Sequence, residues 1–373
     1  YKLINTLCNM RIALRNLCVV AVTFLLMCCK DMSNSPIIQV KDVREVDYLN
    51  KTGDVIEGTF VREIMGGQVI IVCDTLLFAF TSNPEGMLEV YSVNNLQHKL
   101  ASLCKRGRAE NEMSMLSIAQ VYKKENHYYM LLVDAFVRFC EIDITESLEK
   151  GYTVVTRTKM RQFDQMGHAI FLNNDIDYTL DYIPRYNHPE IEDDTKYPRV
   201  KYTLVKGDKH TELKFFNAPT QVADKGFVDD PYYGGVRKHP SKNIVVNYFS
   251  YMDYILFMDF DKNHNFVVHQ QGSTTHEDLY INKEPWIKTF TSCLPTEEYV
   301  FIFYRNGDYS SIMREENVWY PELLIFDWEG NYLKGFKMDR NSSSLGYDSE
   351  RKILYTFTSQ KEQLYAYDLS GLL

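Results

Sequence analysis

The feature that most constrains this chain is a short repeat, in which an apolar, strand-like run ends at an aspartate and a flexible turn residue follows. The clearest copies begin at Leu323 (LLIFDWEGNYL), Leu364 (LYAYDLSG) and Tyr254 (YILFMDFDKNHN). Aspartate caps a turn through its side chain, and Gly or Asn accepts the positive φ that a tight hairpin needs. The repeat therefore predicts consecutive antiparallel hairpins.

Weaker copies end at Asn94, Asp143 and Lys206, so turns are expected at 94, 143, 206, 261, 327 and 368. A four-stranded propeller blade needs about 40–50 residues, and longer spacings leave room for loops. Six turns predict an all-β, six-bladed β-propeller, with five or seven blades as alternatives. Short β-rich runs that fit its strands lie at Val69–Cys73, Leu76–Thr81, Leu88–Val93, Tyr128–Val133, Ile244–Tyr248, Tyr254–Phe260, Tyr299–Tyr304, Leu323–Phe326, Ile353–Phe357 and Leu364–Tyr367.

A closed ring needs one strand from each end of the domain in the same blade. The apolar run Ile37–Val40 is the first strand-like segment, and the chain ends at Leu373, directly after the last turn. We expect Ile37–Val40 to complete the blade that the C-terminal strands begin, because this pairing removes exposed sheet edges.

The first 36 residues have the pattern of an export signal. A cationic stretch from Met10 precedes an apolar run, Leu17–Met27, that is too short to span a bilayer. With Leu26 at −3 and Cys28 at −1, Cys29 resembles the acylated cysteine of a bacterial lipobox.

We therefore expect a lipoprotein signal peptide at 1–28, with Met10 as the alternative start, a tether at 29–36 and one propeller domain at 37–373. This organisation predicts a lipid-anchored protein of the bacterial cell envelope, at the outer membrane, with the periplasmic or surface side left open. A plain secretory signal and a single membrane anchor are the alternatives.

Charge and cysteine usage narrow the function classes. The net charge is −9 although the leader is basic, which argues against nucleic-acid binding because such binding depends on Lys and Arg contacts to phosphate. Cys73, Cys104, Cys140 and Cys293 are widely spaced and lack zinc-site spacing. They could form zero, one or two disulfides, and buried free strand cysteines are the favoured interpretation.

The segment Lys105–Met113 (KRGRAENEM) carries a family resemblance. Together with the lipobox and the turn repeats, it resembles TolB-like six-bladed β-propeller lipoproteins, which commonly have a G-R-G-P-x-E-F-like segment after the first blade's outer strands. Arg106, Gly107, Arg108 and Glu112 match this pattern, whereas Ala109 replaces the usual Pro and Met113 the usual aromatic residue. The resemblance covers most of residues 37–373 and implies a fold and export, but no reaction.

Five residues are candidates for ligand binding. Arg106, Arg108 and Glu112 fit an anion or carboxylate site on a propeller face, because arginine offers paired donors to such groups. The alternative is a structural turn whose Arg and Glu side chains pair with their neighbours. Tyr232 and Tyr233 lie in an aromatic segment that could stack on a sugar or peptide, or simply pack against the ring.

No motif implies a metal, a cofactor or a catalytic nucleophile. The spacing of His264, His269 and His276 suits neither a helical nor a strand metal site, and the acidic runs at 190–194 and 229–230 lack calcium-loop spacing. The long insertions at 183–200 and 224–242 are expected on a face, where loops often carry function.

The sequence thus predicts a binding or scaffold module for a protein, peptide or glycan partner. The alternative is an extracytoplasmic hydrolase or lyase with a site in the central channel, with or without the help of a metal.

Overall fold

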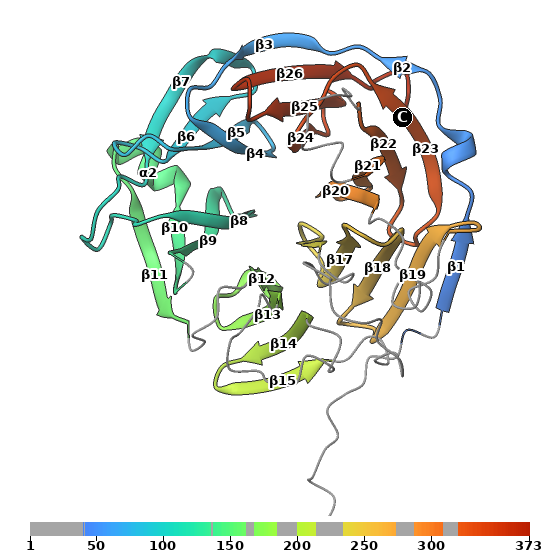
Figure 1. The fold of residues 1–373 in the computed structure, drawn as a ribbon. Coiled ribbons are helices and arrows are strands. Elements are labelled where there is room, and N and C mark those ends of the chain that lie inside the picture. Colours follow the sequence, from blue (N-terminus) through green and yellow to red (C-terminus); the bar gives the residue numbers. More distant parts are fainter. Residues whose placement is uncertain are drawn as a thin grey trace, which may run out of the picture. The chain divides into compact units, whose positions relative to one another are not determined.

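The computed structural model describes residue 40 and residues 42–135, 137–161, 168–184, 200–213, 234–273, 287–308 and 320–373. In these residues six sheets of mainly antiparallel strands surround a common centre, within a compact unit that spans residues 38–373 (Figure 1). The described fold is a six-bladed β-propeller, as the turn repeat predicts. The predicted leader and tether lie outside the described residues.

The six sheets follow the chain in order, and each predicted β-rich run lies within a strand or extends at most one residue beyond it. Numbered along the chain, blade 1 contains β4 (Gly67–Cys73), β5 (Leu76–Thr81), β6 (Leu88–Ser92) and β7 (Asn95–Leu103); blade 2 contains β8 (Leu116–Lys124), β9 (His127–Asp134), β10 (Arg138–Asp143) and β11 (Val154–Met160); and blade 3 contains β12 (His168–Phe171), β13 (Tyr178–Pro184), β14 (Val200–Lys206) and β15 (Lys209–Leu213).

The other three sheets each include a strand from the N-terminal part of the domain. Blade 4 contains β16 (Gly234–Lys238), β17 (Ile244–Phe249), β18 (Tyr254–Asp259), β19 (His264–Gln270) and β1 (Asp42–Val46); blade 5 contains β20 (Ile287–Pro295), β21 (Val300–Asp308), β22 (Glu322–Phe326), β23 (Tyr332–Met338) and β2 (Val55–Ile56); and blade 6 contains β24 (Ser344–Asp348), β25 (Ile353–Thr358), β26 (Gln363–Asp368) and β3 (Thr59–Glu63).

The predicted turns lie at one topological position, directly after the third strand of each blade. The Asp259 carboxylate accepts the backbone N–H groups of Asp261 and Lys262 at 3.0 and 2.9 Å. The Asp327 carboxylate caps its turn by accepting the Asn331 N–H at 2.8 Å, and Gly330 between them has a φ of 79°. Aspartate capping and a left-handed turn residue therefore explain the repeat.

Blade 2 departs from the expected tight turn. Asp143 ends β10 and begins the short helix α2 (Ile144–Lys150), whose N-cap bond runs from the Glu146 N–H to the Asp143 carboxylate at 2.8 Å. The helix ends at Gly151, which has a φ of 74°. The same capping chemistry thus begins a helix instead of a hairpin.

The strand that closes the ring differs from the sequence prediction. The fourth strand of blade 6 is β3, which pairs antiparallel with β26. The predicted strand Ile37–Val40 does not fill this place: Ile37 to Gln39 lie outside the described residues, and Val40 packs against the buried cluster between blades 3 and 4. The prediction that strands from both ends of the domain share the closing blade is confirmed. The prediction that Ile37–Val40 is the N-terminal strand of that blade is wrong.

The segment between β1 and β3 follows the outer edges of three blades in turn. β1 pairs parallel with β19, β2 pairs parallel with β23, and β3 then closes blade 6 (Figure 1). Between β1 and β2, the 3₁₀ turn η2 (Leu49–Lys51) follows Tyr48. The side-chain oxygen of Gln270 accepts the backbone N–H groups of Tyr48 and Leu49 at 3.0 and 3.1 Å.

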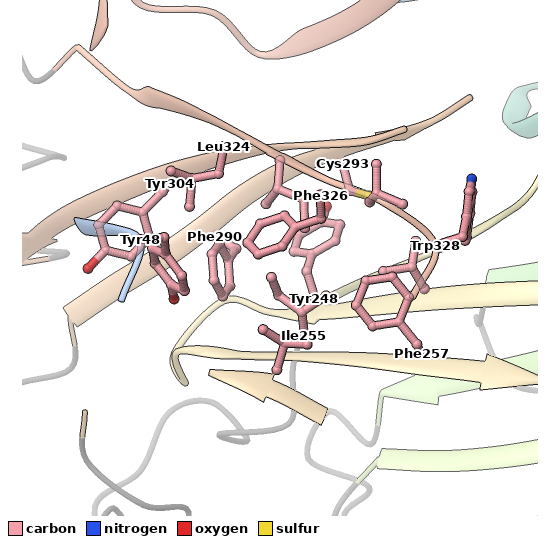
Figure 2. Close-up of a cluster of buried hydrophobic side chains, with 14 of the residues drawn as sticks. Tyr48, Tyr248, Ile255, Phe257, Phe290, Cys293, Tyr304, Leu324, Phe326 and Trp328 are labelled. Carbon is pink, nitrogen blue, oxygen red and sulfur yellow. The ribbon is translucent and has the colours of Figure 1, made fainter. Parts of the chain in front are cut away.

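Tyr48 is fully buried in the core between blades 4 and 5. Its ring lies 5.9 Å from the rings of both Tyr304 and Phe326 (Figure 2). Its hydroxyl donates a hydrogen bond to the carboxyl of Asp253. Burying an aromatic ring of this size contributes a few kcal/mol. The outer segment is therefore part of the core.

The two faces of the ring differ in their connections. Strands alternate in direction, so links from second to third strands, and from each fourth strand to the next blade, leave on the same face, here named the long-connection face. The longest of these links join Pro184 to Val200, Leu213 to Gly234, Gln270 to Ile287 and Asp308 to Glu322. On the opposite, short-turn face, strands are joined by two to six residues, except where α2 intervenes.

The predicted insertions are partly strands. Ile183 and Pro184 end β13, Val200 begins β14, and Gly234–Lys238 is the innermost strand of blade 4, followed by the turn to β17. The rest of the ranges 183–200 and 224–242 lies outside the described residues. The Gly-rich composition around 234 hides this strand, because Gly234 and Gly235 approach Tyr248 too closely for any side chain.

Candidate functional site

The segment Lys105–Met113 crosses the long-connection face from β7 to β8. Its ends are held by backbone bonds, from the Met113 N–H to the Lys105 carbonyl at 3.0 Å and from the Gly107 N–H to the Met113 carbonyl at 3.1 Å. The Glu112 carboxylate accepts the Ala109 N–H at 3.0 Å. A Cβ at Gly107 would lie 1.9 Å from a Glu112 carboxylate oxygen, so glycine allows this close approach. Glu112 therefore braces the turn.

Arg106 and Arg108 are exposed, and among the described residues neither forms an ion pair. Nearby Arg138 is different: it binds the Asp134 carboxylate at 2.7 Å and donates to the Glu112 carbonyl at 2.7 Å. The turn thus uses Arg138 and Glu112 for its own structure. Arg106 and Arg108 remain available to a ligand.

Three exposed apolar side chains continue from this turn across blade 2. Met115, Val137 and Met160 are 42%, 46% and 64% exposed, although residues of these types are mostly buried. Backbone bonds join the segments that carry them: the Ala135 N–H donates to the Met115 carbonyl at 2.9 Å, and the Arg161 N–H donates to the Val137 carbonyl at 2.7 Å. We call Arg106, Arg108, Met115, Val137 and Met160 the blade 2 rim.

A buried ion pair between blades 2 and 3 lies directly beneath the rim, next to Met160. An Arg161 guanidinium nitrogen lies 3.1 Å from an Asp181 carboxylate oxygen, and both side chains are 1% exposed. The Thr179 hydroxyl donates to the same carboxylate at 3.0 Å. Burial raises the pKa of Asp181, while Arg161 opposes this shift.

The cavity beside this pair, lined by Met160, Arg161 and Asp181 among others, holds about 10 Å³, which is about the space of one water molecule. It is too small for an organic ligand. The ion pair therefore supports the rim from below, and any ligand of the rim must bind on the surface.

The short-turn face has a different kind of polar cluster, which spans blades 3 and 4. The Lys238 ammonium donates to the Asn174 side-chain oxygen at 3.3 Å and to the carbonyls of His239 and Pro240 at 2.9 and 3.3 Å. These acceptors use all three of its protons. Burial lowers the pKa of Lys238 to about 8, but the complete set of acceptors marks a structural cation.

His239 is fully buried beside Lys238. Its Nδ1 accepts the N–H groups of Ser241 and Lys242 at 3.1 and 3.2 Å, so the ring is neutral with its proton on Nε2. Burial lowers the pKa of His239 to about 4, and its ring lies 4.6 Å from that of Trp328 in blade 5. The Nε2 atom is buried and has no hydrogen-bond partner among the described residues. The cluster therefore joins neighbouring blades through Lys238 and the His239 ring.

The other residues that the sequence suggested are scattered. His264 is exposed at the start of β19, His269 is buried beside Ser273, and His276, Tyr232 and Tyr233 lie outside the described residues, as does Cys29. Cys73, Cys104, Cys140 and Cys293 are free, and burial raises the pKa of each thiol. Within the described part of the chain, no three His, Cys, Asp or Glu side chains converge on a metal position.

Sequence reasoning identified Arg106 and Arg108 but missed Met115, Val137 and Met160. These apolar residues lie at the ends of strands or beside them, where the alternation of buried and exposed side chains no longer applies. The pattern of the strands therefore does not report their exposure.

Comparison with solved structures identifies relatives in fold. A member of the DUF4221 family from Bacteroides vulgatus matches with a TM-score of 0.51 and 9% identity, over 84% of this chain and 98% of that one. Their common property is the fold. No protein-family model and no curated protein matches the chain.

Two further structures have TM-scores below 0.5. A candidate exported protein from Bacteroides fragilis has a TM-score of 0.48 and 10% identity, over 89% of this chain and 98% of that one. The β-propeller domain of Cps50 from Myceliophteria thermophila has a TM-score of 0.42 and 9% identity, over 84% and 100%. Among the described residues, no helix is long and apolar enough to cross a membrane.

Proposed function

We propose that this chain is a lipid-anchored binding protein of the bacterial cell envelope, and that its blade 2 rim binds a protein partner through apolar and acidic side chains. One observation carries the proposal: three exposed apolar side chains, and two arginines without ion pairs among the described residues, lie on one face in segments that backbone bonds join. Of the partner classes that the sequence leaves open, a peptide or protein fits this surface better than a glycan, because the side chains of methionine and valine offer apolar contacts and no hydrogen bonds.

The composition of the rim is typical of interaction surfaces. Methionine adapts to different apolar shapes, and both methionine and arginine are enriched at protein interfaces. Arg106 and Arg108 would face acidic side chains of the partner. These charge pairs would orient the partner on the rim and make its binding weaker at high salt concentration. Glu112 would have an indirect part, since it holds the turn that carries both arginines.

The membrane anchor and the TolB-like relationship belong to the same proposal. The leader pattern that ends at Cys28-Cys29 supports acylation of Cys29, and a lipidated cysteine followed by a polar tether would hold the propeller at a membrane. The position of Arg106-Gly107-Arg108, directly after the outer strand β7, supports the relationship, because TolB-like propellers carry their matching segment there.

The rim is tested by capture from native membranes with the full-length, lipid-anchored protein as bait. Three baits are compared: wild type, an Arg106→Glu/Arg108→Glu/Met160→Glu variant, and Tyr152→Glu, which alters an exposed residue on the short-turn face. We expect wild type and Tyr152→Glu to retain the same partner and the rim variant to lose it at least tenfold. Equal recovery by all three baits, with equal thermal unfolding midpoints, would contradict the proposal.

The anchor is tested separately by labelling cells with palmitate. Wild type should incorporate the label and remain with membranes, whereas Cys29→Ser should remain unlabelled. Cys28→Ser serves as the control and should still be labelled, since serine is small enough for the −1 position. Label on the Cys29→Ser protein would show that the acylated residue is another one.

A further inference from the structure

A second arginine-based feature lies on the long-connection face, between blades 5 and 6. Arg305 follows Phe301 and Phe303 at alternate positions of β21, and both phenylalanines are fully buried in the core between these blades. Alternation along a strand directs Arg305 toward the same interface. Arg305 is half-buried there, so its guanidinium is partly removed from water.

The polar partners of Arg305 are incomplete. Its Nη2 donates to the side-chain oxygen of Asn341, but its Nε has no acceptor among the described residues. The hydroxyl of Ser342, the next residue after Asn341, likewise has no partner in the described part of the chain, and Ser342 is only 6% exposed. Buried polar groups without partners are uncommon, because each costs about 1–3 kcal/mol.

The segment that carries Asn341 and Ser342 is held in place. The Thr358 hydroxyl donates to the Asn341 carbonyl at 2.7 Å, and the Ser343 hydroxyl donates to the Phe357 carbonyl at 3.0 Å. Both bonds tie this segment to β25. The backbone on both sides of Ser342 is therefore held in place, as expected of a preformed binding site.

Arg305 also has no ion-pair partner in the part of the chain that the structure describes. Its neighbour Arg340 binds Asp339, and Arg351 donates from its Nε to the Asp348 carboxylate at 2.7 Å. Burial lowers the pKa of Arg305, and no carboxylate of the described residues opposes this shift. The guanidinium nevertheless stays charged, because arginine does not lose its proton in proteins.

We propose that Arg305, Asn341 and Ser342 form a binding site for the carboxylate group of a ligand. A guanidinium edge presents paired N–H donors that match the two oxygens of a carboxylate, and the Ser342 hydroxyl adds a neutral donor. A single unpaired positive charge suits a monoanion better than a phosphate dianion. The site uses none of the rim residues, so it can hold even if the rim binds no partner.

The site is tested by NMR of arginine side chains in the full-length protein. The Nε–H signal of Arg305 is assigned by its loss in Arg305→Lys and followed during titration with acetate and with inorganic phosphate. We expect a saturable shift with acetate, binding at least fivefold tighter than phosphate, and at least threefold weaker acetate binding in Ser342→Ala. The Nε–H signal of Arg351, which already has a carboxylate partner, is the internal control.

Three outcomes would overturn the proposal: no saturable shift of the Arg305 signal, an equal shift at Arg351, or equal or tighter binding of phosphate. A second measurement does not depend on the assignment. Acetate should raise the thermal unfolding temperature of wild type and leave that of Arg305→Lys unchanged. Equal stabilisation of both proteins would also count against the site.

Discussion

At the scale of single residues, the same side chain has opposite roles in different places. Asp259 and Asp327 cap turns, and their carboxylates accept backbone N–H groups. Asp253 is buried and accepts the hydroxyl of Tyr48, and its burial raises its pKa to about 7. The sequence shows only an aspartate in each case. Its role depends on which residues the fold brings into contact with its carboxyl group, such as Tyr48 at Asp253.

Asp253 gives a prediction for the pH dependence of stability. Between about pH 4 and pH 7 the folded state keeps the Asp253 proton that the unfolded state has released, so the free energy of unfolding falls as pH rises. One such group contributes at most about 1.4 kcal/mol per pH unit. The Asp253→Asn side chain keeps an oxygen that accepts the Tyr48 hydroxyl, but it cannot titrate. The free energy of unfolding of this variant should therefore fall less steeply with rising pH than that of wild type.

Urea unfolding of both proteins at pH 5, 6, 7 and 8 measures this difference. Other titrating groups, such as Asp181, are common to both proteins and cancel in the comparison. Parallel stability profiles for wild type and Asp253→Asn would show that burial of Asp253 does not affect its titration.

At the scale of elements, the repeat predicts most strands because each aspartate turn acts locally. It misses strands that depend on distant contacts. β16 begins with Gly234 and Gly235, whose composition is typical of a loop, and it becomes a strand only through pairing with β17. The closing strand β3 pairs with β26, which lies some 300 residues later, so no local signal distinguishes it from Ile37–Val40.

The closing pair gives a prediction at this scale. Glu63 of β3 lies opposite Gln363 of β26, so a Glu63→Cys/Gln363→Cys variant should form a disulfide under mild oxidation. The bond closes a long loop and should raise the free energy of unfolding by about 2–4 kcal/mol relative to the reduced form. Gel mobility without reductant and urea unfolding measure both effects.

The matched control places the first cysteine in the strand that the sequence had suggested. Val40 packs with blades 3 and 4, so Val40→Cys/Gln363→Cys should not form the bond. Cross-linking of the control but not of the 63–363 pair would show that a different strand closes blade 6.

At the scale of the whole molecule, the two faces of the ring differ: one has buried polar contacts between blades, and the other exposes the blade 2 rim. On the short-turn face, Lys238 binds Asn174 of blade 3, and the ring of His239 packs against Trp328 of blade 5. The long-connection face presents the blade 2 rim, whose members come from two connections and one strand end. The fold could be predicted because its repeat is local. The rim could be predicted only at Arg106 and Arg108, because its apolar members lie in connections and at a strand end, where the alternation of buried and exposed residues does not apply.

The claim on which this account depends is that the blade 2 rim contacts a partner in the cell. Site-specific photocrosslinking tests it most directly, with a benzophenone amino acid at Met115, at Met160 or, as the control, at Tyr152 on the short-turn face. We predict the same partner adduct from positions 115 and 160 and none from position 152. An adduct from position 152 alone would contradict the account.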